Sequence, residues 1–426
     1  MFRRSLFRSS PPRFTYQRLK DVPHRVLPAP PPRMVVFCEH PLTRSDRLLI
    51  HVGDAVQTGQ KIVPFSDSDA YVIAPATGTI QGIEPFVGNF GSQWTRIEVA
   101  ADGPEVWDEA FCAAAANPDA DLLTTWMAQL PGALPVRELC RPERAIDTLV
   151  VAATETDLGT VTAQYVLRHR SGALTRGIDL LKTITGAQRT LLAVGQETVQ
   201  GMGHLHADPM AVPLWYPAAA PPLVAQQLLG RAVPADSTLE KLGICIVPVE
   251  AAAALGQSLA DGRPCLDKTL TVIAKDGCQN LVTVRLGTPV GDVCQALGIE
   301  LGDGDRLIVG GPMAGTAIYT LDYPVRPDTH ILMVQDAAGV TRFGDDPCIN
   351  CGACVRICPT HVPVNMLVRF LEAGQYAEAA ERYDLLSCVD CGLCSYVCTA
   401  RIPISQYIRL AKHELALSAA AEAEDA

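Results

Sequence analysis

The feature that most constrains this chain is a cysteine spacing that occurs twice near its C-terminal end. The two runs are Cys348-x2-Cys351-x2-Cys354-x3-Cys358-Pro359 and Cys388-x2-Cys391-x2-Cys394-x3-Cys398. A thiolate at every third residue lets one tight turn present three sulfurs to three irons of a single [4Fe-4S] cube. Zinc knuckles are built from separate C-x2-C pairs, so the spacing predicts two iron-sulfur clusters and argues against two zinc sites.

The fourth cysteine of each run points away from its own cube, and in runs of this form it ligates the other cluster. This predicts a crossed assignment of the eight ligands. Cluster one takes Cys348, Cys351, Cys354 and Cys398, and cluster two takes Cys388, Cys391, Cys394 and Cys358. Gly352 and Gly392 follow the second cysteine of each run, where a side chain would crowd the cube.

The remaining cysteines predict no further chemistry. Of 15 cysteines, seven are scattered singly, and none has a neighbouring base that would mark a nucleophile. We assign them to cores or surfaces: Cys38, Cys112, Cys140, Cys245, Cys265, Cys278 and Cys294. A net charge of -11 argues against nucleic acid as the main partner.

Membrane and export signals are not found in the sequence. It has no run of about 18 apolar residues, and the basic start lacks an apolar export segment, so we expect the cytoplasm as the compartment. The first 33 residues are basic, and they either bind an anionic membrane face or an acidic partner or form a solvated arm. These cations are Arg3, Arg4, Arg8, Arg13, Arg18, Lys20, Arg25 and Arg33.

The organisation along the chain predicts a multidomain α/β and α+β protein. Short β-like runs bounded by glycine and proline follow the arm, and among them is a predicted strand at 48–52. Strands then alternate with helices such as 161–184, which is typical of βαβ units. Strands with a small helix at 291–297 precede the cysteine-rich helical end. The expected units are 1–33 (basic Pro-rich arm), 34–105 (barrel), 106–264 (α/β), 265–335 (β-grasp), 340–413 (cluster domain) and 414–426 (Ala/Glu tail).

Phrases spread over nearly the whole chain resemble the C subunit of the Rnf electron-transport complex, and more distantly the cobalamin reductase of propanediol microcompartments and the A subunit of the sodium-pumping quinone reductase. They are Val52 to Gln60 and Ala74 to Ile80, Arg285 to Val290, Gly310-Gly311-Pro312-Met313, Pro347 to Gly352, Ser395 to Cys398, Ile402-Pro403 and Gln406 to Arg409. The resemblance implies a lipoyl-like barrel-sandwich hybrid, a Rossmann-like domain of the complex I flavoprotein type, a β-grasp (SLBB-like) module and a C-terminal α-helical dicluster ferredoxin domain.

Family members that oxidise NADH bind FMN through a glycine-rich loop, and this chain departs from that pattern. Its equivalent stretch is 130–136, where only Gly132 could allow the close backbone approach to phosphate. A second family signature is degenerate at 152–158, although Glu155 survives. We therefore expect neither FMN nor NADH to bind. Tyr216-Pro217 matches a family position near the flavin, and here we expect it only to pack.

Two further candidate sites carry little weight. Lys61 would be the modified residue of a lipoyl carrier, but it lies within an apolar strand-like run and not at a hairpin tip. His204, His206 and Asp208 form an H-x-H-x-D string, which we interpret as a polar loop because a metal site needs a third ligand with suitable spacing.

Together these features predict an electron-transfer subunit of a membrane-associated oxidoreductase complex. It would relay single electrons at the cytoplasmic face, bound peripherally to the inner face of the cell membrane. Its partners would be integral membrane and redox subunits of an Rnf-like complex, with a soluble ferredoxin or flavoprotein as a further donor. Outer-sphere transfer needs no catalytic residue. The alternatives are a soluble NADH/FMN-dependent reductase of ferredoxin or cobalamin, and a scaffold subunit.

Overall fold

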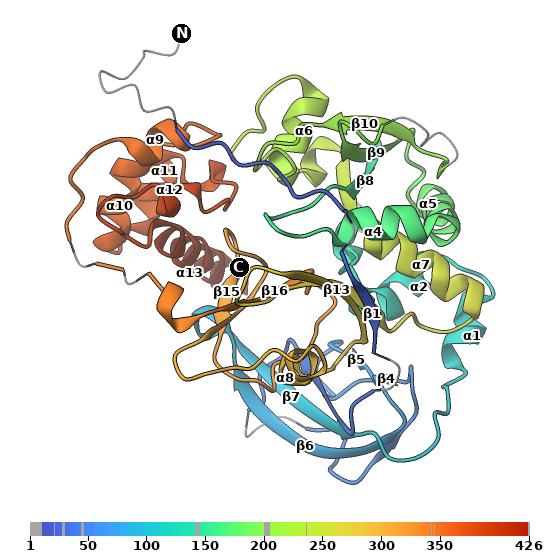
Figure 1. The fold of residues 1–426 in the computed structure, drawn as a ribbon. Coiled ribbons are helices and arrows are strands. Elements are labelled where there is room, and N and C mark those ends of the chain that lie inside the picture. The colour runs from blue at the N-terminus through green and yellow to red at the C-terminus, as the bar shows by residue number, and fades with distance from the viewer. Residues whose placement is uncertain are drawn as a thin grey trace.

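The computed structural model describes residues 11–424 apart from 21, 28–29, 44–46, 141–144, 200–204, 236, 342 and 345. Figure 1 shows the β-rich N-terminal unit at the bottom, the mixed sheet in the middle, the α/β unit at the upper right and the C-terminal helices at the upper left. Among these described residues, no helix combines the length and the apolar character needed to cross a bilayer.

The N-terminal unit is a small β-structure built around one long hairpin. Its strands are β2 (Arg33–Cys38), β3 (Ala55–Val56), β4 (Lys61–Ile62), β5 (Val72–Ile73), β6 (Gly78–Val87) and β7 (Gln93–Ala100). They form a four-stranded sheet in the order β2-β7-β6-β3 and a separate β4-β5 pair. Alternate residues such as Met34, Ile97 and Val99 fill the core between these sheets.

The strand expected at 48–52 is wrong in its extent, because the structure has only an isolated bridge between Leu48 and Phe65. The backbone N-H of His51 donates to the Asp54 carboxylate at 2.7 Å, which turns the chain before a longer ladder can form. Lys61 lies in β4 with its ammonium 4.6 Å from the centre of the Tyr71 ring.

The α/β unit contains a four-stranded parallel sheet in the order β10-β9-β8-β11. Its strands are β8 (Thr148–Ala153), β9 (Arg189–Gly195), β10 (Asp208–Val212) and β11 (Ile244–Pro248). Its helices are α1 (Ala110–Ala115), α2 (Ala120–Trp126), α3 (Val136–Cys140), α4 (Thr162–His169), α5 (Ser171–Thr185), α6 (Pro221–Leu229) and α7 (Val249–Asp261).

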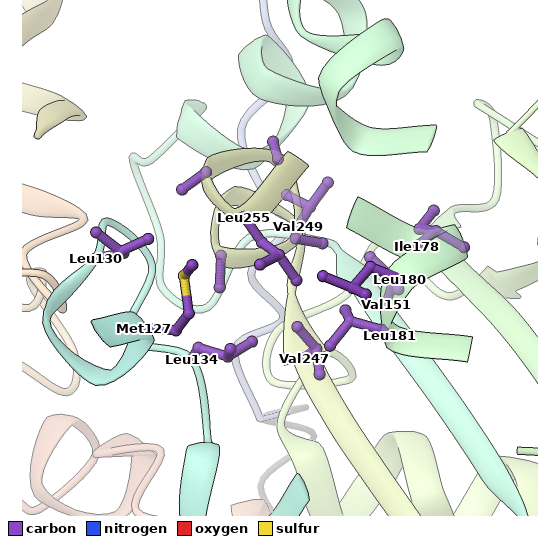
Figure 2. Packing of buried hydrophobic residues seen from close by; sticks show 14 of the residues in the cluster. Met127, Leu130, Leu134, Val151, Ile178, Leu180, Leu181, Val247, Val249 and Leu255 are labelled. Atoms are coloured by element: carbon purple, nitrogen blue, oxygen red, sulfur yellow. The ribbon is translucent and has the colours of Figure 1, made fainter. Parts of the chain in front are cut away.

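Both faces of this sheet are covered, which explains why its strands are almost continuously apolar. Leu149 and Val151 of β8 face the large core formed with α4, α5 and α7, part of which is drawn in Figure 2. Val150 points to the opposite face, where it packs in a second core with Val224 and Ala225 of α6.

The helix expected over 161–184 is two helices, α4 and α5, because Arg170 leaves the helical region with φ -120° and ψ 28°. Helices α5 and α7 then touch backbone to backbone. A Cβ atom on Gly177 would lie 1.8 Å from the carbonyl oxygen of Ala252, and one on Gly256 would lie 1.9 Å from that of Ala173. Only glycine permits this approach.

The mixed sheet has the order β1-β13-β12-β16-β14-β15. Its elements are β1 (His24–Val26), β12 (Asp267–Ile273), β13 (Gln279–Arg285), α8 (Val290–Ala296), β14 (Arg306–Val309), β15 (Thr316–Ile318) and β16 (Ile331–Gln335). Residues 24–26 therefore belong to a sheet, although the sequence assigned them to an extended arm. They pair in parallel with β13, and this pairing satisfies backbone groups that an edge strand would otherwise expose.

The C-terminal segment is helical, with α9 (Ala353–Ile357), α10 (Val364–Glu372), α11 (Tyr376–Tyr383), α12 (Leu393–Tyr396) and α13 (Ile404–Glu424). The two helices expected between the cysteine runs are confirmed as α10 and α11, and Gly374 (φ +69°) separates them. The stretch from residue 414 continues α13 as far as Glu424, because alanine and glutamate are strong helix formers.

Candidate metal centres

The eight cysteines of the two runs lie around two separate spaces. One is lined by Cys348, Cys351, Cys354 and Cys398, and the other by Cys358, Cys388, Cys391 and Cys394. Each space thus takes three thiols from one run and the fourth thiol from the other run. This grouping has the same members as the crossed assignment made from the spacing, and ligation itself stays a prediction.

The two runs share one backbone geometry. Asn350 and Asp390, Gly352 and Gly392, and His361 and Arg401 occupy equivalent positions, and all six have a left-handed φ between +52° and +72°. Left-handed residues turn the loop tightly enough for successive cysteines to face the same space. Short helices follow each glycine, α9 after Gly352 and α12 after Gly392.

Backbone N-H groups point at sulfur, as a cluster site needs. Asp390 N-H donates to the Cys388 sulfur at 3.4 Å, and Ile402 N-H donates to the Cys398 sulfur at 3.4 Å. Such hydrogen bonds stabilise thiolate and help to set the reduction potential of a cluster. Four thiols, tight glycine turns and donors aimed at sulfur fit a [4Fe-4S] cluster in each space.

Burial distinguishes one pair of equivalent thiols in the two sets, Cys351 and Cys391. Burial raises the pKa of the Cys388 thiol to about 12 and that of Cys391 to about 11. Cys351 is exposed, and the backbone N-H of Ala353 is the main cause that lowers the pKa of its thiol. The Cys391 thiol is therefore less exposed to water than its equivalent in the first run, Cys351.

The thiol set predicted to hold cluster two faces the body of the protein through the loop around Gly392. A Cβ atom on Gly392 would lie 2.1 Å from the carbonyl oxygen of Met313, in the Gly310-Gly311-Pro312-Met313 loop, whereas the nearest atom to one on Gly352 is the end of the Arg356 side chain at 3.1 Å. Leu393 is buried in the same core as Tyr216, with Met313 packed against it. Only one of the two equivalent loops is thus covered by the rest of the described chain.

A network of polar groups fixes this contact. The Asp157 carboxylate accepts hydrogen bonds from the backbone N-H groups of Met313 and Ala314, the latter at 2.8 Å. Burial raises the pKa of the Asp157 carboxyl to about 6. From α13, the Arg409 guanidinium donates to the Ala314 carbonyl at 2.6 Å and the Lys412 ammonium donates to the Cys388 carbonyl at 2.7 Å.

The expectation that Tyr216 only packs is wrong, because its hydroxyl donates to the Cys391 carbonyl at 2.7 Å. The sequence reasoning also missed the roles of Asp157, Arg409 and Lys412. The spacing of Arg409 and Lys412, one helical turn apart beside buried Ile408, indicates a shared face of α13, but sequence alone does not pair that face with a loop.

The other candidate positions have structural roles. The Gly132 N-H donates to the Pro327 carbonyl and the Ala133 N-H to the Leu130 carbonyl, so neither is free to hold a phosphate. Buried Glu155 accepts hydrogen bonds from the backbone N-H groups at the start of α4. His206 contacts Asp179 at 2.9 Å, and His204 lies outside the described residues.

Known family models match two parts of the chain, the N-terminal β-structure and the cysteine-rich C-terminal segment. The family model "RnfC Barrel sandwich hybrid domain" matches residues 20–104, and "4Fe-4S dicluster domain" matches residues 347–402. The C subunit of the ion-translocating oxidoreductase complex from Pseudomonas aeruginosa is 29% identical over 335 residues, which cover 74% of this chain and 43% of that protein. The chain is RnfC-like.

Two further relatives carry the same name. The Methanosarcina acetivorans protein is 26% identical, with 79% of this chain and 82% of that one covered. The Citrobacter koseri protein is also 26% identical, with 82% and 52% covered. The RnfC-like chain therefore spans about half the length of two of these three relatives.

Among solved structures, an NAD+-reducing [NiFe]-hydrogenase in the air-oxidized state is similar to the RnfC-like chain, with 18% identity and a TM-score of 0.45. The match covers 70% of this chain and 60% of that one. A TM-score of this size does not establish a shared fold. The barrel-sandwich hybrid and the dicluster domain are thus the parts of the expected architecture that the comparisons confirm.

Proposed function

We propose that this RnfC-like chain is an electron-transfer subunit of a membrane-associated oxidoreductase complex. It relays single electrons through two [4Fe-4S] clusters, one in each thiol-lined space. The observation that carries the proposal is the sorting of eight cysteines into two crossed sets of four around two separate spaces. Its relatives are named as the C subunit of an ion-translocating oxidoreductase complex, and this supports such a complex as its setting.

The clusters supply outer-sphere electron transfer, and the chain's own residues hold and insulate them. Cys348, Cys351, Cys354 and Cys398 hold cluster one, and Cys358, Cys388, Cys391 and Cys394 hold cluster two. Arg409 and Lys412 place two cations beside the cluster-two loop. Lys412 pairs with the Asp390 carboxylate of that loop at 2.6 Å, so it is chiefly Arg409 that offsets part of the negative charge of four thiolates.

The finer architecture and setting belong to the same proposal. The parallel sheet with its helices is a Rossmann-like domain of the complex I flavoprotein type, and the mixed sheet with α8 is a β-grasp, SLBB-like module. The chain binds peripherally at the cytoplasmic face, with integral membrane and redox subunits as partners. Because the N-H groups of Gly132 and Ala133 are bound within the chain, the loop at 130–136 does not offer the glycine N-H cradle of a flavin phosphate site, and we assign neither FMN nor NADH to it.

Anaerobic reconstitution of the full chain tests the proposal. We expect about eight irons and eight inorganic sulfides per chain, as two four-iron cubes require, and two reducible paramagnetic centres by electron paramagnetic resonance. Cys398→Ser should remove the signal of the cluster whose other ligands lie in the first run, and Cys358→Ser should remove the other signal. Cys112→Ser, an exposed thiol outside the runs, is the control. Zinc in place of iron, or no reducible centre, contradicts the proposal.

A further inference from the structure

The described part of the N-terminal segment is held against the protein as an extended strap, defined here as residues 13–19. Tyr16 N-H donates to the Leu214 carbonyl, and Tyr216 N-H donates to the Phe14 carbonyl, both at 2.9 Å. Side chains alternate along the strap as they do in a strand: Phe14 and Tyr16 point inward, and Tyr16 is 8% exposed. The sequence expected a solvated or partner-binding arm here, and these residues instead bind their own chain.

The strap lies along the edge of the parallel sheet where its strands end. Gln164, near the start of α4, donates to the Gln17 carbonyl at 2.9 Å and accepts from the Leu19 N-H at 2.9 Å. Arg18 forms an ion pair with Glu197, which follows β9. The carboxyl edge of an open parallel sheet is where such folds usually bind a ligand. Tyr16 and its neighbours occupy part of that crevice and leave a cavity of about 320 Å³ beside them.

Two aromatic contacts connect the strap to the loop of cluster two. The ring of Tyr16 meets that of Tyr216 edge to face, with centroids 5.7 Å apart, and the Tyr216 hydroxyl donates to the Cys391 carbonyl. The ring of Phe14 meets that of Tyr396 at 5.0 Å, and Tyr396 lies in α12 between Cys394 and Cys398.

The strap also contributes to the apolar cover of that loop. Tyr16, Tyr216 and Leu393 are buried in one core, and Phe14 and Cys391 are partly buried against it. Phe14 and Tyr16 therefore reach the cluster-two loop from a point more than 370 residues earlier in the chain. The corresponding loop of cluster one has an exposed cysteine, Cys351, and an exposed Ile349.

We propose that the strap lowers the reduction potential of cluster two. Phe14 and Tyr16 are positioning residues that keep the loop around Cys391 packed and exclude water from it, so the potential of cluster two is lower than it would be in a hydrated site. The inference rests on the proposed function, since it requires both clusters. Reduction adds negative charge, which apolar side chains solvate less well than water. Loss of either ring admits water beside cluster two and shifts its potential to a more positive value.

The test is a redox titration of the anaerobic full chain, followed by electron paramagnetic resonance, for wild type, Tyr16→Ala and Phe14→Leu. The two signals are assigned with the Cys398→Ser and Cys358→Ser variants. We expect a positive shift of the cluster-two potential, larger for Tyr16→Ala, and an unchanged cluster-one potential. Arg25→Ala is the matched control, because Arg25 is an exposed cation of the same segment outside the strap.

Tyr216→Phe keeps the ring and removes the hydroxyl that binds the Cys391 carbonyl, so it should also shift cluster two alone, without loss of packing. Hydrogen exchange of the segment 391–396 should rise in Tyr16→Ala and stay unchanged in Arg25→Ala. Equal shifts of both clusters, or no shift in any strap variant, overturn the inference. A wild-type chain without clusters instead overturns the proposed function.

Discussion

Alanine in place of Gly392 should loosen the contact between the cluster domain and the body of the protein. Gly392 has φ +72°, and its Cβ atom would lie 2.1 Å from the Met313 carbonyl oxygen. A left-handed conformation costs a non-glycine residue roughly 1–2 kcal/mol. Overpacking against a backbone group that cannot rotate away adds about 1–3 kcal/mol.

Gly352→Ala provides the matched control for this prediction. Gly352 has nearly the same φ, +70°, and occupies the equivalent position in the first run, but the nearest atom to its Cβ would be the end of the Arg356 side chain at 3.1 Å, which donates to the Cys351 carbonyl. Backbone strain and crowding of the cube are therefore common to the two variants. Their difference, about 1–3 kcal/mol, isolates the contact with Met313.

Hydrogen exchange measures that difference. The N-H groups of Met313 and Ala314 are bound by Asp157 while the contact is closed, and they exchange when it opens. Because 1.4 kcal/mol corresponds to a tenfold change, exchange in the segment 311–315 should be roughly 5- to 150-fold faster in Gly392→Ala than in Gly352→Ala. Equal rates in the two variants would refute the reasoning.

Three further predictions concern other parts of the chain. Burial raises the pKa of Asp157 from 3.8 to about 6. As the pH rises from about 4 through 6, wild type should therefore lose up to about 3 kcal/mol of stability relative to Asp157→Asn. Thermal unfolding of both proteins against pH measures this loss, and parallel curves would mean that the carboxyl is solvated. Lys268→Met should cost about 3 kcal/mol, because buried Glu250 loses its ammonium partner and keeps only the contacts with His330 and the Thr269 N-H among those described. Lys268→Met with Glu250→Leu should recover much of this loss, and denaturation that finds the double variant no better than the single one contradicts the pairing. Purified chain with both clusters should show no flavin absorbance, and stoichiometric FMN would overturn the interpretation of the loop at 130–136.

Local patterns predicted much of the fold. Helices α10 and α11 follow from apolar residues at helical spacing on either side of Gly374, and the dicluster and barrel-sandwich units follow from motifs short enough to be read in sequence. The helix break at Arg170 was not predictable, because arginine and serine are both compatible with a continuous helix. Residues 24–26 were missed as a strand because their pairing partner lies more than 250 residues away.

In the candidate site, too, the local features were predictable from the sequence and the contacts between distant segments were not. The spacing predicted the same two groups of cysteines that line the two spaces, since each run is local, and their ligation of clusters stays a prediction. The residues that join cluster two to the protein could not be named, because Tyr216, Asp157 and Arg409 come from three distant segments. Their roles depend on tertiary packing, for which a single sequence has no periodic signal.

The crossing of α5 and α7 limits how this molecule can deform. At Gly177 and Gly256 the backbones of the two helices meet directly, and no side chain at these two positions can change rotamer to let them slide. Backbone lies directly on backbone, so the two helices and the parallel strands beneath them should shift only as a single rigid block. We therefore expect any rearrangement of the chain to occur at the margins of that block, in the loops and segments that reach across to neighbouring units.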